Sequence, residues 1–176
     1  MRLVEFVAWG MSRIGRARAA CAGLAVSATV IASFMVYGQI AAAAADADRC
    51  AAVSQARIAD TTIVQTKIVP ATASLPEYCQ VDGYVTTPGD GIVSHNEVNF
   101  RVGAPTTTWN SDLYFEGVGG LAGLIIPLDA GLRRGYASAS TDTGHQGSLK
   151  LNNPVRDGSW ALHNRPKIVD LSLIHI

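Results

Sequence analysis

Apolar and polar residues alternate along much of the chain between residues 61 and 103. The run TIVQTKIV (62–69) alternates as a β-strand does and stops at a proline. Residues 81–87 and 95–103 also predict strands, and the turn sequence PGDG separates them. Upstream, the apolar spacing within residues 50–58 is close to that of a short helix. This part of the chain therefore predicts a short helix followed by antiparallel β structure.

The pattern changes after Pro105. DLYFEG (112–117) is a short, mostly apolar strand of the kind that is buried on both faces. Residues 126–135 predict a helix, with Pro127 in its first turn and Gly135 at its end. YASASTD (136–142) predicts the next strand, and residues 144–170 are polar and irregular, with Trp160 as their one large apolar anchor. Antiparallel strands followed by β-loop-α-β indicate the entry into an α/β sheet.

The N-terminal segment has the features of an export signal. Three arginines precede an apolar run (19–37), and the alanine tract 41–45 offers small residues for cleavage. Residues 1–47 are interpreted as a signal peptide, with Met11 as an alternative start, and the protein as secreted or periplasmic. The alternative is an uncleaved membrane anchor, because the apolar run is near spanning length.

Cys50 and Cys79 remain as one pair in the mature chain that this signal implies. In an oxidising compartment, the default state of such a pair is a disulfide. A metal site is the alternative, but no CxxC spacing or nearby histidine cluster supports it.

Length and charge narrow the classes of function. The 176 residues are enough for one modest domain and not for two. Lys and Arg number 14 and Asp and Glu number 14, so the net charge is zero. Neither nucleic acid nor, after cleavage of the signal, a membrane is therefore indicated as a partner.

A glycine-rich loop, with glycines at 117, 119, 120 and 123, follows the strand predicted at 112–117. GVGGLA fits the dinucleotide motif G-x-G-x-x-A, and Asp142 follows where a ribose-binding acid belongs. However, Pro127 suggests a helix that starts beyond the motif, and several strands precede it. The second use is an oxyanion loop, where glycine lets a substrate carbonyl approach the backbone closely. The third interpretation is a bend that binds no ligand.

Several segments together resemble the tannase and feruloyl esterase family. Three segments match the family in order and spacing: WNSDLYFEGVGGLAG, LRRGYASASTDTGH and GSWALHNRPKIVD. The segment from Cys50 to Cys79 is also similar to the mature N-terminus of the family. The resemblance covers residues 50–170. It implies a secreted α/β-hydrolase with a lid domain, which cleaves esters of aromatic acids such as gallate, ferulate or terephthalate.

The resemblance also implies roles for individual residues. Gly119 and Gly120 match the glycine loop that provides an oxyanion donor, and the two cysteines match an N-terminal disulfide. The TD-x-GH motif is interpreted as ordering the turn after a strand, with its aspartate accepting backbone N–H bonds. Its members here are Asp142, Gly144 and His145. A role of this histidine as catalytic base is disfavoured, because in this fold the base follows the nucleophile in sequence.

The nucleophile of the family is the residue that this sequence lacks. It is a serine in a Cys-Ser-x-Gly-Gly elbow, and neither that motif nor G-x-S-x-G occurs here. The predicted fold class is therefore α/β: the N-terminal part of an α/β-hydrolase, in which antiparallel strands lead into a mostly parallel sheet, truncated before the nucleophile elbow. Residues 48–170 are interpreted as this portion of the hydrolase domain and 171–176 as an aberrant tail. The triad is expected beyond the C-terminus, so the chain as written is predicted to be inactive.

The resulting functional hypothesis is a fragment of a serine esterase that acts by acyl transfer and hydrolysis on a small aromatic ester. No organic cofactor is implied, and the resemblance leaves a metal site in the lid domain open. Two alternatives remain: a non-catalytic secreted module and a dinucleotide-binding domain.

Overall fold

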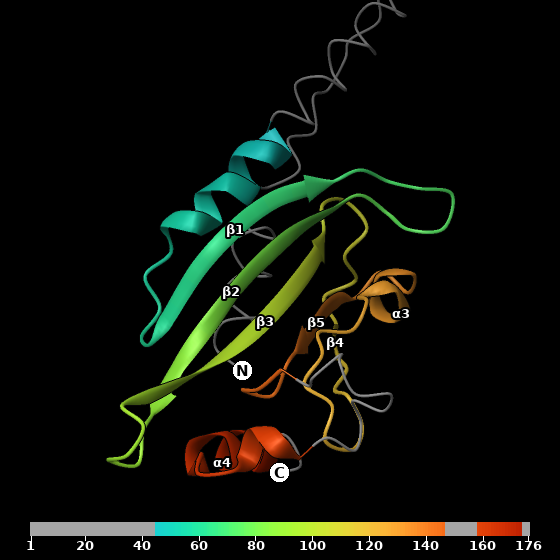
Figure 1. Cartoon of the computed structure of the whole chain (residues 1–176). Helices are drawn as coiled ribbons and strands as arrows, with labels where there is room; N and C mark the ends of the chain where they lie inside the picture. Colours follow the sequence, from blue (N-terminus) through green and yellow to red (C-terminus); the bar gives the residue numbers. More distant parts are fainter. Residues whose placement is uncertain (1–44, 147–157, 174–176) are drawn as a thin grey trace, which may run out of the picture.

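The computed structural model describes residues 45–146 and 158–173, and this part of the chain contains one five-stranded sheet (Figure 1). The predicted signal peptide lies outside the described residues, apart from 45–47. The strands are arranged in the order β1-β2-β3-β5-β4. Their bounds are β1 Thr61–Val69, β2 Tyr78–Pro88, β3 His95–Pro105, β4 Leu113–Phe115 and β5 Ala137–Thr141.

The sheet is mixed. β1 pairs antiparallel with β2, β2 with β3, and β3 with β5, as the alternation in the sequence predicts for the first three strands. Only β4 and β5 are parallel among the strands that the structure describes. The described strands thus contain the predicted antiparallel part and, after Pro105, one parallel pair in the predicted β-loop-α-β order, while a mostly parallel sheet beyond them stays a prediction.

A row of small and branched side chains crosses the centre of the sheet and forms its core. Val81 lies opposite Val102, and Val102 lies opposite Ala139, so β2, β3 and β5 contribute to one apolar face. Alternation places these side chains on the same side because successive residues of a strand point to opposite faces. The sequence pattern therefore positions the core correctly.

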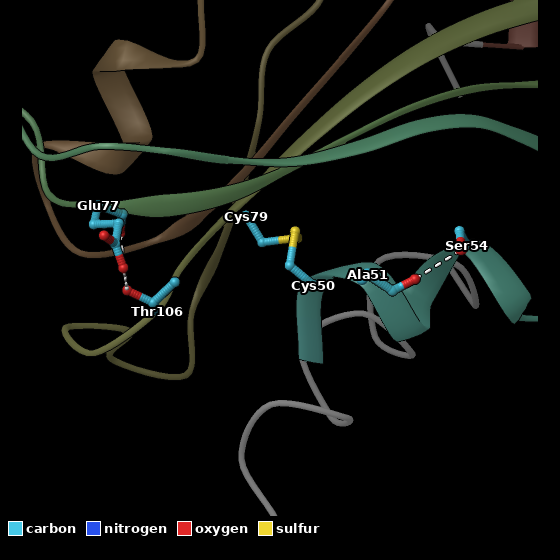
Figure 2. Close-up of a disulfide and its surroundings, with 6 residues drawn as sticks. All are labelled: Cys50, Ala51, Ser54, Glu77, Cys79 and Thr106. Atoms are coloured by element: carbon cyan, nitrogen blue, oxygen red, sulfur yellow. Dashed lines mark hydrogen bonds between the residues drawn. A yellow bond between two sulfur atoms is a disulfide. The ribbon is translucent and has the colours of Figure 1, made fainter. Parts of the chain in front are cut away.

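A helical segment covers this apolar face. Residues 45–52 are helical and continue into the short helix η1 Val53–Gln55, which packs beside β1 (Figure 1). The predicted disulfide is present: Cys50 in this segment is joined to Cys79 on β2, and both are buried (Figure 2). The helical spacing that extends to Ile58 in the sequence is not realised, because the helix ends at Gln55.

The opposite face of β5 packs against α3 Asp129–Leu132 and the segment before it. A Cβ on Gly131 would lie 2.8 Å from the Ser138 hydroxyl, and one on Gly103 would lie 2.8 Å from a methyl group of Leu128. Glycine at these two places therefore allows the helical turn to lie directly on the strands.

Two elements differ from those predicted after Pro105. The strand β4 is an edge strand, with Leu113 44% and Phe115 50% exposed, so it is not buried on both faces. The helix expected over 126–135 has only four residues, Asp129–Leu132, and the backbone N–H of Ile126 before it donates to the Ser140 hydroxyl. Gly135 ends the turn as predicted, with a φ of 75°.

The region predicted as irregular contains two helices, η3 Ser159–Ala161 and α4 Arg165–Leu173. The helix α4 has a buried proline, Pro166, as its second residue and packs near one end of β2 and β3. Residues 171–173 continue this helix, and the interpretation of 171–176 as an aberrant tail stays a prediction. Among residues 45–146 and 158–173, every helix is too short or too polar to traverse a lipid bilayer.

The disulfide is expected to make a large contribution to stability. Replacing both Cys50 and Cys79 with alanine should lower the free energy of unfolding by about 3 kcal/mol, because the bridge reduces the conformational entropy of the unfolded chain. The two residues are 29 positions apart. Urea denaturation of the wild type with and without reductant is the control that leaves the side-chain volumes unchanged. Equal midpoints in the two conditions would contradict the expectation.

Candidate functional site

The glycine loop, residues 116–127, connects β4 to α3. Its first residue, Glu116, still donates a backbone hydrogen bond to the Ala139 carbonyl of β5, so the loop leaves the sheet at the carboxyl ends of the parallel pair. No helix begins within the motif, since α3 starts at Asp129. A dinucleotide pyrophosphate needs a helix N-terminus at the motif, and the structure does not provide one.

Gly119 and Gly120 lie in the exposed part of this loop. Within the described residues, neither backbone N–H has a hydrogen-bond partner. A Cβ built on Gly119 would have no atom within 4 Å, so the space beside this backbone is open. Gly120 has a φ of 66°, a conformation that favours glycine. The loop therefore presents two amide donors that are available to a ligand.

The second half of the loop is held firmly against the rest of the protein. The Leu121 carbonyl accepts a 2.8 Å hydrogen bond from Nε2 of His145, and the Ile126 N–H donates to the Ser140 hydroxyl over 3.0 Å. At Gly123, an added Cβ would overlap the His145 carbonyl oxygen. This close backbone approach explains why glycine occupies position 123.

The imidazole of His145 is buried, with 2% of the residue exposed. A carbonyl oxygen can only accept a hydrogen bond. Nε2 therefore carries the proton and donates a hydrogen bond to the Leu121 carbonyl. Nδ1 lies 3.1 Å from the Thr143 hydroxyl, which can donate to it. The ring stacks on Trp160, with centroids 3.7 Å apart and planes 20° apart. Both nitrogens are therefore occupied within the protein, which is unlike a base that must receive a proton from a substrate or nucleophile.

Asp142 ties the turn that contains His145 to strand β3. Its Oδ1 accepts hydrogen bonds from the backbone N–H of Asn99 and of Gly144, and its Oδ2 accepts one from the Asn99 side chain at 2.6 Å. The backbone N–H of Asp142 in turn donates to the Asn99 carbonyl. Burial raises the pKa of the Asp142 carboxyl above its ordinary value, and the bonds from Asn99 and Gly144 oppose that shift only in part.

A second polar contact holds the same turn from the other side. The Asn96 side chain donates to the Gly144 carbonyl over 2.9 Å and to Asp170 of α4 over 2.7 Å. The Thr87 hydroxyl donates to the same carboxylate oxygen over 2.8 Å. Gly144 has a φ of 80°, and a Cβ there would lie 2.8 Å from the Asn96 amide nitrogen. The turn 142–145 is therefore enclosed between β3 and α4.

Several of these partners could not be assigned from the sequence. Asn96 shares its strand face with Val98, Phe100 and Val102, so a polar residue in an apolar row was the one available indication. Asn99, Asp170 and the Trp160 stack left no such indication. Their partners are distant in the chain, and sequence spacing does not reveal them.

Among residues 45–146 and 158–173, no nucleophile and base come together at the glycine loop. A serine–histidine hydrogen bond joins neighbouring residues Ser94 and His95 over 3.0 Å, and both side chains are exposed at the start of β3. In the described ranges, no three His, Cys, Asp or Glu side chains cluster in a way that could hold a metal ion. The site that the described residues form is thus a pair of free amides on an anchored loop.

Comparisons with known proteins point to one family. Residues 79–175 match the family described as tannase and feruloyl esterase. An uncharacterised esterase of Xanthomonas campestris pv. campestris is 33% identical over 145 residues, which cover 76% of this chain and 23% of that protein. A solved tannin acyl hydrolase from Aspergillus niger aligns with a TM-score of 0.36 and 26% identity, over 49% of this chain and 18% of that chain. The chain thus spans about a quarter of the length of the curated relative.

The two glycines 119 and 123 should respond differently to alanine. Gly123→Ala is expected to lower the free energy of unfolding by about 1–3 kcal/mol, because the new Cβ overlaps the His145 backbone. Gly119→Ala is the matched control, since its Cβ points into open space. Urea denaturation measures both. Equal stability of the two variants would show that the loop is not held against His145.

The buried carboxyl of Asp142 predicts a pH dependence of stability. Because its folded-state pKa is raised above 3.8, the folded protein binds this proton more tightly than the unfolded chain. The stability that Asp142 contributes through this proton is fully present below the ordinary pKa of the carboxyl. It is lost as the pH rises through the pKa in the folded state. The stability of the wild type relative to Asp142→Asn should therefore fall over that window in urea titrations. A relative stability that rises with pH would contradict the assignment.

Proposed function

Because the chain belongs to the tannase and feruloyl esterase family, we propose that it is the N-terminal part of a secreted carboxylic ester hydrolase and supplies half of the oxyanion hole. The observation that carries the proposal is the pair of exposed amides at Gly119 and Gly120, which have no hydrogen-bond partner among the described residues and precede the anchored half of the loop. Backbone N–H groups fixed in this way stabilise the negative oxygen of an acyl-transfer intermediate.

The proposed reaction is serine acyl transfer. The serine oxygen attacks the ester carbonyl carbon, and the carbonyl oxygen gains the negative charge that the glycine-loop amides would bind. Collapse of this intermediate breaks the bond between the carbonyl carbon and the alcohol oxygen. The alcohol departs with the proton that the serine hydroxyl lost, and an acyl-enzyme remains. Water then attacks the acyl carbon, and the acid is released with the serine restored. One lost oxyanion donor typically reduces kcat by about 10²–10³.

The nucleophile and its partners are proposed to lie in a longer polypeptide. The 176 residues contain neither a Cys-Ser-x-Gly-Gly nor a G-x-S-x-G motif. Since the chain corresponds to 23% of its curated relative, most of that relative has no counterpart here. In this proposal residues 48–170 form the N-terminal portion of the hydrolase domain, and residues 1–47 direct export. The family match runs to residue 175, so it does not support an aberrant tail at 171–176. The buried disulfide supports an oxidising destination.

The substrate is proposed to be a small ester of an aromatic acid, such as a galloyl or feruloyl ester. The support is the family description. A non-catalytic secreted module is the second candidate. The missing serine motif favours it, since a chain without a nucleophile cannot form an acyl-enzyme.

An activity comparison tests the proposal. The purified 176-residue chain should not hydrolyse methyl gallate or methyl ferulate, whereas an extended enzyme that also contains the remaining part of the family's hydrolase should hydrolyse at least one of them. A fluorophosphonate that modifies serine nucleophiles should abolish the activity of the extended enzyme. If the 176-residue chain hydrolyses either ester and the fluorophosphonate abolishes this activity, the nucleophile does not lie in the missing part and the assignment is refuted.

Gly119→Ala in the extended enzyme connects the activity to the loop. A Cβ at this position is expected to displace the substrate carbonyl and reduce kcat/KM by about 10- to 100-fold, while the folded structure accommodates it. An active extended enzyme with unchanged kinetics in this variant would separate the esterase function from Gly119.

A further inference from the structure

One residue outside the glycine loop determines how that loop is held. His145 follows β5, yet its Nε2–H donates to the carbonyl of Leu121, 24 positions earlier and one residue beyond Gly120. Strand β5 adds a second anchor, since the Ser140 hydroxyl accepts the N–H of Ile126. Between Glu116 and Leu121, no backbone group has a hydrogen-bond partner among the described residues. The histidine is therefore the anchor nearest to the two free amides.

A fixed carbonyl at Leu121 restricts the backbone immediately before it. The peptide group is planar, so the bond fixes the plane that contains the Leu121 carbonyl and the Ala122 N–H, and with it the end of the segment that carries the amides of Gly119 and Gly120. Glycine loses more conformational freedom on ordering than any other residue, and Gly119 and Gly120 would otherwise sample many orientations. Donors stabilise a developing charge effectively only when they are oriented in advance. By fixing the end of this short segment, the bond from His145 thus limits the directions that the two upstream amides can adopt.

The surroundings of the imidazole favour the state that donates to Leu121. Thr143 is fully buried and places its hydroxyl 3.1 Å from Nδ1, so a proton on that hydroxyl leaves Nδ1 as acceptor and Nε2 as donor. Thr143 adopts a φ of 60°, which is costly for a β-branched residue. Backbone strain of this kind persists where the surrounding structure enforces it, and it often occurs at functional sites. Trp160 stacks on the face of the ring and restricts its orientation.

We propose that His145 is a positioning residue for ester hydrolysis: it does not exchange protons with the substrate, but holds the Leu121 carbonyl and thereby directs the amides of Gly119 and Gly120. The inference rests on the proposed esterase function. It assigns the histidine of the TD-x-GH motif a role in the rate of the chemical step, in addition to ordering the turn after β5.

Two substitutions of similar chemistry separate the role of the bond from that of the fold. In His145→Gln the side-chain amide nitrogen reaches the position of Nε2 and retains the donor. In His145→Asn the amide is one methylene shorter, so it can meet Thr143 but not Leu121. His145→Phe retains the stack on Trp160 and removes the donor. His95→Phe, at an exposed histidine on β3, is the control for the substitution itself.

Steady-state kinetics of the extended enzyme with methyl gallate or methyl ferulate provide the first readout. His145→Asn and His145→Phe should reduce kcat by about 10- to 100-fold with little change in KM, because misdirected donors affect the transition state more than substrate binding. His145→Gln and His95→Phe should remain within about threefold of the wild type. A merely structural role would instead reduce the amount of folded enzyme and leave kcat per folded molecule unchanged.

The order of the loop provides the second readout and needs no activity. With ¹⁵N-glycine labelling of the extended enzyme, the amides of Gly119 and Gly120 should show restrained heteronuclear NOE values in the wild type and His145→Gln, and greater motion in His145→Asn. Equal kcat in folded Gln and Asn variants would overturn the positioning role, as would glycine amides that are equally mobile in all forms. If His145→Phe does not fold, the comparison of His145→Gln with His145→Asn still tests the positioning role. An extended wild type that hydrolyses neither ester would count against the proposed function alone, and the NOE comparison would then still test the anchor.

Discussion

Three hydrogen bonds between Asn99 and Asp142 join the middle of strand β3 to the end of β5. They lie at the point where the β3–β5 ladder stops, next to the pair Phe100 and Thr141. The carboxylate is buried, and burial of a charge is costly unless donors surround it. The Asp142 carboxylate can accept all of its hydrogen bonds only if the chain after β5 turns at this place and in this direction. The glycine loop, the His145 ring and the approach of α4 all depend on that turn.

The turn is enclosed by polar contacts on two sides. Asn99 and Asp142 fix its beginning, and Asn96 joins the Gly144 carbonyl to the Asp170 carboxylate of α4. A buried network of this kind stabilises one arrangement strongly, because each unsatisfied member would carry a desolvation cost. It also places α4 against the sheet through polar groups: Ile168 and Val169 of this helix are exposed, while Asp170 is buried.

This polar attachment explains what could be predicted from the sequence and what could not. Strands β1, β2 and β3 were predicted because each has an alternating face, with Val81 and Val102 in register at the centre. The helix α4 was missed since its buried side carries Asp170 in place of an apolar stripe. Similarly, an apolar DLYFEG predicted a central strand, although β4 lies at the edge of the described sheet. Strand identity depends on local pattern, whereas strand position depends on distant partners.

The site divides in the same way. The glycines of the loop are visible in the sequence, and so is the motif TD-x-GH, but the bond from His145 to Leu121 spans 24 positions and has no local signature. Asn99, which completes the Asp142 contact, lies on a strand 43 positions earlier. Chemistry-bearing residues could therefore be selected from the sequence, while their connections required the three-dimensional structure.

The Cys50–Cys79 bridge has a consequence for the covalent integrity of the domain. The exposed segment 70–74 lies between the two cysteines, in the connection from β1 to β2. A protease that cuts there in an oxidising environment cannot release the piece before the cut, because the sulfur bond still joins it to β2. The ladder between β1 and β2 then needs no loop to bring its strands together, since the bridge maintains their high local concentration. The domain can thus be nicked in this loop and remain one molecule, and only the combination of cleavage and reduction would separate its parts.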